Sequence, residues 1–199
     1  MTRSRSRGSP RKDKPAPAIA KKQVYVFCEG ERTEPDYIRH WEREHRHQVV
    51  VVIDDFHGGP LQLVDRAIDR RQDDMREERR GRGRAFDEYW CVFDRDEHGS
   101  FDSAVNRAVS RDIRVAHTNP CIELWFMLHF VDQTAFIHRH DAQQRSKELL
   151  GCENGCLPTR WFNSKQPSIQ RGQGLKHWIG NTISTTPLRG RTRAVRSGG

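Results

Sequence analysis

The stretch that decides the fold is QVYVFCEGE, residues 23–31. Its first six residues form a short apolar run without polar alternation, which is typical of a strand covered on both faces of a sheet. The run stops at Glu29 and Gly30, and the apolar side of a helix follows at residues 37–41. Thr33 is placed to cap this helix. A buried strand that leads directly into a helix predicts an α/β arrangement.

The same pattern occurs three more times along the chain. The expected strands cover residues 49–53, 89–93 and 113–116, and helices follow from about residues 61, 101 and 121. Strands that alternate with helices imply parallel pairing through right-handed crossovers. We therefore predict an α/β fold, a parallel-sheet sandwich of about four strands flanked by helices, over residues 22–141.

The two ends of the chain differ from this central part in composition. Residues 1–21 are rich in Arg, Ser, Pro and Lys, which predicts a disordered basic tail. Residues 142–199 lose the strand–helix pattern, so we expect an irregular basic C-terminal region with one short helix near residues 142–150. Residues 1–22 carry a net charge of +7, residues 142–199 carry +8, and the part between them carries −7. Basic ends favour contact with a polyanion such as nucleic acid.

Several classes of protein are excluded by composition. The 199 residues contain no apolar run of the roughly 18 residues that a membrane-spanning helix needs, so no membrane contact is expected. The N-terminus lacks the apolar segment of a secretory signal. Five cysteines without framework spacing indicate a reduced, cytoplasmic chain. Because no P-loop motif is present, we expect no ATP hydrolysis of that type.

Acidic residues stand where two of the expected strands end. Glu29 ends the first strand, and Asp94 and Asp96 end the third, 65 positions further along. The carboxyl ends of parallel strands open onto one edge of a sheet, which is where ligands bind, so the three carboxylates are expected to meet there. Alternation places Asp94 and Asp96 on one side and Arg95 on the other. The alternative is that these acids are ordinary solvent-facing strand ends.

Converging carboxylates repel one another unless they are protonated or bridged by a cation. A ligand set made only of oxygen atoms suits Mg²⁺ or Mn²⁺. One or two such ions would activate water and stabilise the charge that develops on a phosphodiester. His98 and Asn119 are expected at the same edge, where either could contact a substrate, although Asn119 is first of all a helix cap.

Three motifs, in this order, resemble the RloB family: VFCEGERTEPDY at residues 26–37, WCVFDRDE at 90–97 and NPCIELW at 119–125. RloB-like proteins resemble Toprim domains, the metal-binding α/β fold of topoisomerases, bacterial primases and OLD-type nucleases. They occur as partners of AAA/ABC-type ATPases in phage-defence systems. The resemblance covers about residues 22–140.

The resemblance implies roles for particular residues. Glu29 matches the Toprim glutamate that acts as metal ligand or general acid/base, and Asp94 and Asp96 match the metal-binding DxD pair. Glu34 and Glu123 fall in the family's motifs, as metal-supporting or second-metal ligands. Glu31 is a further candidate for supporting or substrate contacts.

The expected function is a Mg²⁺-dependent Toprim-like nuclease acting on DNA or RNA, the effector of an ATPase-coupled abortive-infection system. The alternative is a non-catalytic regulatory or binding subunit that docks on a partner ATPase and whose acids are structural. An aspartate-dependent phosphohydrolase ranks lower, because its nucleophile would be needed where Glu29 stands.

The C-terminal region departs from the family pattern after Leu150. A frameshifted or truncated reading frame is one hypothesis for this loss, and it would impair this copy. Cys152 and Cys156 lie near His138 and His140, but their spacing is poor for a zinc site.

Overall fold

The structure is a computed structural model and describes residues 20–95, 99–128 and 130–151. These residues contain a four-stranded, wholly parallel sheet in the order β2-β1-β3-β4. Its strands are β1 (Lys22–Cys28), β2 (Val49–Ile53), β3 (Glu88–Asp94) and β4 (Arg114–Thr118). The predicted α/β sandwich is therefore confirmed. Residues 1–19 of the predicted N-terminal tail, most of the predicted C-terminal region, Asp96, His98, Cys152 and Cys156 lie outside the described residues.

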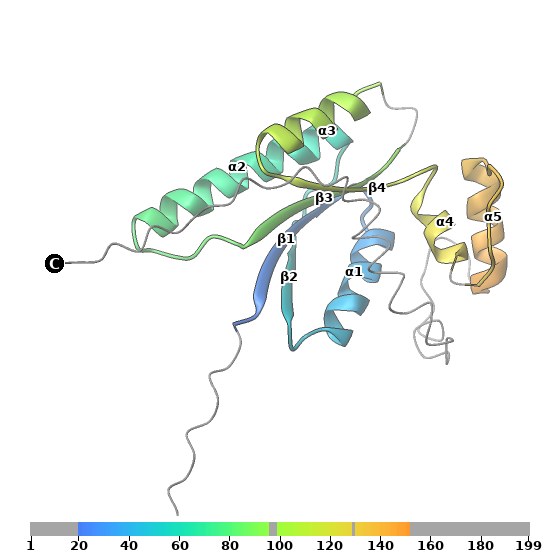
Figure 1. The fold of residues 1–199 in the computed structure, drawn as a ribbon, viewed down its shortest axis with the longest axis horizontal. Coiled ribbons are helices and arrows are strands. Elements are labelled where there is room, and N and C mark those ends of the chain that lie inside the picture. Colours follow the sequence, from blue (N-terminus) through green and yellow to red (C-terminus); the bar gives the residue numbers. More distant parts are fainter. Residues whose placement is uncertain (1–19, 96–98, 129, 152–199) are drawn as a thin grey trace, which may run out of the picture.

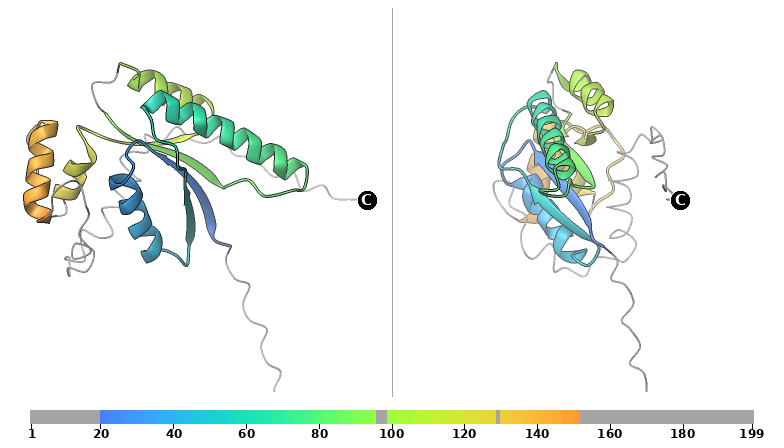
Figure 2. Two further views of the ribbon diagram at one scale, coloured as in Figure 1. Left: turned by 180° about the vertical axis from the view of Figure 1, so that it is seen from behind. Right: turned by 90° about the vertical axis from the view of Figure 1, so that its left-hand side faces the viewer.

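Helices cover both faces of the sheet. They are α1 (Thr33–Glu44), α2 (Pro60–Arg79), α3 (Phe101–Ser110), α4 (Ile122–Met127) and α5 (Arg139–Leu150). Figure 1 shows α2 and α3 above the sheet and α1 below it, with α4 and α5 beyond the carboxyl ends of the strands. The reverse view in Figure 2 shows the same layers. In the described part of the chain, no helix combines the length and apolar character needed to cross a membrane.

Strand β1 is apolar throughout because both of its faces are buried. Tyr25 and Phe27 pack beneath α2 and α3, in a core that contains Leu63 and Ala104. The alternate residues, such as Val26, pack on the α1 side. This burial on both faces explains why the sequence of β1 lacks polar alternation.

The strand order makes the pair β1 and β3 the switch point of the sheet. The connection through α1 leads from β1 to one side, to β2, whereas the connection through α2 passes over β1 to place β3 on its other side. Ligands in open α/β sheets bind at such a switch point, outside the carboxyl ends of the strands. The expected site is therefore lined by the residues directly after Cys28, where β1 ends, and by Asp94, where β3 ends.

The helix ends differ in detail from the sequence predictions. Helix α1 begins at Thr33, but its N-cap is Arg32 and no side chain caps it. Helix α4 begins at Ile122, close to the expected start, and ends at Met127, whose carbonyl accepts the N–H groups of Phe130 and Val131 in a turn.

The expected short helix near residues 142–150 is present as α5 and starts slightly earlier, at Arg139. It packs against α4, where Cys121, Met127 and Ala142 are fully buried together. The first turn of α5 therefore contributes to a core shared with the rest of the domain.

Candidate active site

Glu29 and Asp94 meet at the carboxyl edge of the sheet. β1 and β3 are neighbours, and the Glu29 N–H donates to the Val92 carbonyl at 3.0 Å, which continues their pairing by one residue. The Asp94 N–H in turn donates to Glu29 Oε2 at 3.1 Å. Topology thus brings together two acids 65 positions apart and turns the Glu29 side chain toward Asp94.

Asp94 is buried and is held from the neighbouring strand. The Thr118 hydroxyl, opposite Asp94 in the register of β3 and β4, donates to Asp94 Oδ1. The pKa of Asp94 is raised to about 7, first by burial and then by the negative charges of Glu34, Glu123 and Glu29, while the hydrogen bond from Thr118 lowers it. The neighbouring carboxylates therefore disfavour a charge on Asp94, in addition to the larger effect of burial.

Glu34 is a second buried acid in this region. It lies in the first turn of α1, is 6% exposed, and accepts the Gly30 N–H on Oε1 at 3.2 Å. Burial is the largest cause of its raised pKa, with Glu29 and Glu123 adding to it, while hydrogen bonds from its own backbone and Gly30 lower it.

Gly30 leaves room for this packing. A Cβ atom at position 30 would lie 2.2 Å from Glu34 Oε2. The glycine therefore permits the close approach of the Glu34 carboxylate to the turn that follows Glu29.

Glu123 comes from the opposite direction, in the first turn of α4, and is half-buried. Its charge contributes to the raised pKa values of Asp94 and Glu34. Four carboxylates from β1, α1, β3 and α4 thus lie within electrostatic reach of one another. We refer to Glu29, Glu34, Asp94 and Glu123 as the carboxylate cluster.

Two other predicted residues lie outside this cluster. Glu31 is exposed. Asn119 is exposed after β4, before a cis peptide bond to Pro120, and the N-cap of α4 is Cys121. The predicted capping role of Asn119 is therefore wrong, because the helix starts after Cys121.

Sequence reasoning missed Thr118 and His57. Thr118 ends β4 without any motif, and only the strand register places it beside Asp94. His57 lies in the connection from β2 to α2, with Nδ1 3.3 Å from the Cys28 carbonyl oxygen, next to Glu29. Asp54 follows β2, but its carboxylate accepts hydrogen bonds from the Tyr25 hydroxyl at 2.9 Å and the Phe56 N–H at 2.9 Å, away from the cluster.

The carboxylate cluster offers only carboxylate oxygens, the kind of donor that a hard divalent cation takes. Burial is the main cause of the raised pKa values of Asp94 and Glu34, and a cation would offset the smaller contribution from the neighbouring carboxylates. The described residues contain no ready group of three or more His, Cys, Asp or Glu side chains that could hold a metal ion. The expected third ligand, Asp96, is outside the described residues.

Fold and cluster together define an α/β protein with an acidic carboxyl edge. The family model described as RloB-like protein matches residues 24–177, about three quarters of the chain, and the chain belongs to this family. The match continues past residue 141, where the sequence pattern predicted the end of the domain. No curated protein and no solved structure is a significant match to this chain.

Proposed function

We propose that this protein is a Mg²⁺- or Mn²⁺-dependent, Toprim-like nuclease that cleaves phosphodiester bonds of DNA or RNA. The observation that supports the proposal is the hydrogen bond from the backbone N–H of Asp94 to Glu29 Oε2, which holds the Glu29 carboxylate against the end of β3, at the switch point of the sheet. Glu29 and Asp94, with Asp96, would hold the cation. When bound, the cation would activate water and stabilise charge developing on the phosphodiester.

Thr118, Glu34 and Glu29 have further roles in the proposed reaction. Thr118 orients Asp94 through its hydroxyl group. Glu34 fixes the turn after Glu29 through the Gly30 N–H, so that the Glu29 carboxylate is presented toward β3. Glu29 is the residue expected to take or return a proton, since it adjoins Asp94 and is less buried than Glu34.

The biological setting is a further part of the proposal. Family membership supports a role as the effector of a phage-defence system whose AAA/ABC-type ATPase partner senses infection. The three described cysteines are free and buried, which supports a reducing, cytoplasmic compartment.

The direct test is cleavage of DNA and RNA by the purified full chain with Mg²⁺, Mn²⁺ or EDTA, alone and with a candidate AAA/ABC-type ATPase partner. Glu29→Gln and Asp94→Asn should each abolish cleavage, because each removes a cation ligand. Asp36→Asn is a matched control, since Asp36 is an exposed acid on α1 that contacts Arg39. Intact cleavage in both site variants would refute the assignment.

A non-catalytic subunit is the second candidate, and one observation favours it. The carboxylates of Asp94 and Glu34 already accept hydrogen bonds within the protein, from Thr118 and Gly30, as structural acids do. This alternative predicts tight ATPase binding without cation binding or cleavage. Calorimetric titration with Mg²⁺ or Mn²⁺ of the wild type and the Asp94→Asn variant separates the two candidates.

A further inference from the structure

A basic and aromatic cluster lies beside Asp94 on the α3 side of the carboxyl edge. The Arg95 guanidinium carbon is 5.3 Å from the centre of the Phe101 ring. The His117 ring meets the same phenyl ring edge-on, with centroids 5.2 Å apart. Arg95 follows β3, Phe101 begins α3 and His117 lies on β4, so three elements build this cluster.

Thr118 forms hydrogen bonds both to Arg95 of the basic and aromatic cluster and to Asp94 of the carboxylate cluster. Its carbonyl accepts the Arg95 N–H at 2.7 Å, and its hydroxyl donates to Asp94. Because successive side chains of an extended segment point to opposite sides, Arg95 lies over α3 while Asp94 lies with the carboxylate cluster. The two side chains therefore present opposite charges on the two sides of one edge.

The charge of Arg95 is not neutralised by the part of the chain that the structure describes. Arg95 is exposed, and its guanidinium has no ion-pair or hydrogen-bond partner among the described residues. Arginines of α2 such as Arg70 and Arg76 do pair, with Asp74 at 3.0 Å and Asp73 at 2.7 Å. The charge of Arg95 also reaches His117, whose pKa is lowered first by burial and then by Arg95.

We propose that Arg95, seated on the Phe101 ring, binds a backbone phosphate of the polynucleotide next to the phosphodiester held at the carboxylate cluster; this rests on the proposed function. A guanidinium presents several donors that match phosphate oxygens, and stacking on a ring reduces the side-chain freedom lost on binding. Because Arg95 lies on the opposite side from Asp94, it serves a flanking phosphate and affects binding more than bond cleavage.

The test is a fluorescence anisotropy titration of labelled oligo(dT) and oligo(rU) with the full chain in an Asp94→Asn background, which blocks cleavage. Arg95→Gln should weaken binding about fivefold at low salt. It should also reduce the slope of log affinity against log salt by about 0.7, the contribution of one single-strand phosphate contact.

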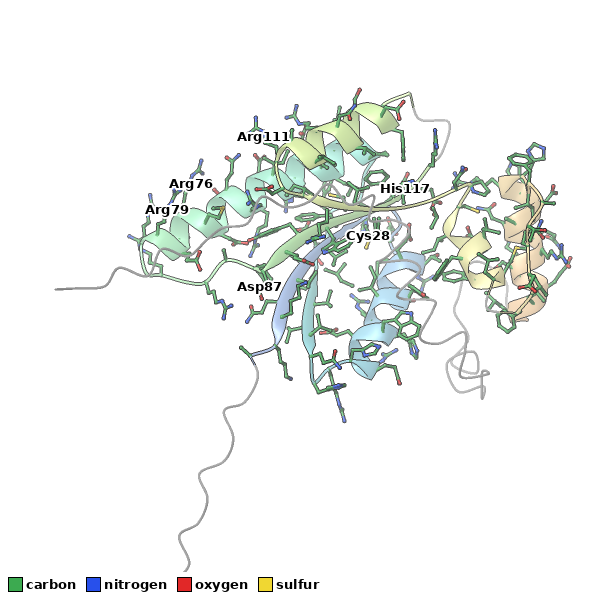
Figure 3. The ribbon with its side chains drawn as sticks, in the orientation of Figure 1. Cys28, Arg76, Arg79, Asp87, Arg111 and His117 are labelled. Carbon is green, nitrogen blue, oxygen red and sulfur yellow. The ribbon has the colours of Figure 1, made fainter. Side chains whose placement is uncertain are left out.

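Arg111→Gln is the matched control. Arg111 is an exposed arginine directly after α3, at the opposite end of β4 from His117, as Figure 3 shows. The Arg111→Gln substitution removes the same charge from the protein, so it measures how much oligonucleotide binding weakens from the loss of one positive charge alone. The effect of Arg95→Gln should exceed that of Arg111→Gln.

Phe101→Leu tests the ring separately from the charge. It should weaken binding when Arg95 is present and have no effect in the Arg95→Gln background, because the ring acts through the guanidinium. Equal effects of Arg95→Gln and Arg111→Gln would overturn the inference and leave the proposed function standing. Absence of oligonucleotide binding, together with absence of cleavage by the wild type, would overturn both.

Discussion

Gly30 leaves no space for a larger side chain, because a Cβ atom there would lie 2.2 Å from Glu34 Oε2. We predict that Gly30→Ala displaces the Glu34 carboxylate, loses cleavage and lowers the free energy of unfolding by about 1–3 kcal/mol. Urea unfolding and the nuclease assay check this. Gly83→Ala is the control, since nothing lies within 4 Å of a Cβ atom there and both measurements should stay close to wild type.

The burial of Asp94 makes the stability of the metal-free protein depend on pH. The pKa of Asp94 is about 7 in the folded chain, against an ordinary value of 3.8, so the folded state holds the proton more tightly than the unfolded state. This contribution to stability is complete below about pH 4 and is lost as the pH rises through about 7, on the order of a few kcal/mol.

Asp94→Asn should therefore flatten the dependence of the unfolding free energy on pH. In EDTA, the variant should be more stable than the wild type at about pH 8, because it carries no buried charge at this position. Urea unfolding over this pH range measures the difference. A wild type that gains stability from pH 5 to pH 8 by as much as the variant would contradict the assignment of Asp94.

Thr118 tunes Asp94 through one hydroxyl group. Its hydrogen bond lowers the pKa of Asp94, so Thr118→Val should raise that pKa further and weaken Mg²⁺ binding about tenfold near pH 7. Thr118→Ser keeps the hydroxyl and should bind Mg²⁺ like the wild type. Isothermal titration calorimetry distinguishes these results, and equal affinity of the Val and Ser variants would show that the hydrogen bond is unimportant.

The order of strands and helices followed from the sequence because β1, β2 and β3 each contain a short apolar run and the helices that follow the strands show a helical spacing of apolar residues. The exact ends and caps of the helices could not be predicted from the sequence. Thr33 has the chemistry of a cap, but the Glu34 carboxylate instead bonds to the Gly30 N–H. Which side chain bonds to which backbone group at a helix end depends on how deeply each is buried, and a local sequence pattern does not show this.

Part of the candidate site was also predictable. The meeting of Glu29 and Asp94 follows from parallel topology alone, and the structure brings them together. Thr118 and Arg95 were not assigned roles, because their contacts depend on strand register and on the position of α3. The expected positions of Asp96 and His98 stay predictions, since both lie outside the described residues.

Helix α5 belongs to the same packing unit as α4, although the sequence pattern ended at residue 141. Ala142 is fully buried with Cys121 and Met127. Ala142→Leu should overpack this contact and lower the free energy of unfolding by about 1–3 kcal/mol. Ala135→Leu, at an exposed position before α5, is the control and should have little effect on urea unfolding. Equal stability of the two variants would show that α5 is not part of the domain core.

The whole chain combines an acidic centre with basic ends, and residues 23–141 carry a net charge of −7. The carboxylate cluster concentrates part of this charge at one edge of the sheet. A cation that binds the folded state alone should stabilise it, by about 2.7 kcal/mol at a concentration 100 times its dissociation constant.

We therefore expect Mg²⁺ to raise the melting temperature of the wild type and to have little effect on the Glu29→Gln/Asp94→Asn double variant. Differential scanning fluorimetry measures this, with NaCl of equal ionic strength as the reference. A similar rise in both proteins would place the cation elsewhere on the molecule.

The order of the strands along the chain also determines at which point of synthesis both acids of the candidate site are present. Glu29 and Asp94 lie on opposite sides of the turn at Gly81, which has a φ of +70°, in the connection from α2 to β3. A growing polypeptide, or a fragment cut at that turn, carries one acid of the pair without the other. Under the proposed function, a nascent chain that has emerged only as far as this turn cannot cleave nucleic acid, and activity begins only after β3 has paired with β1.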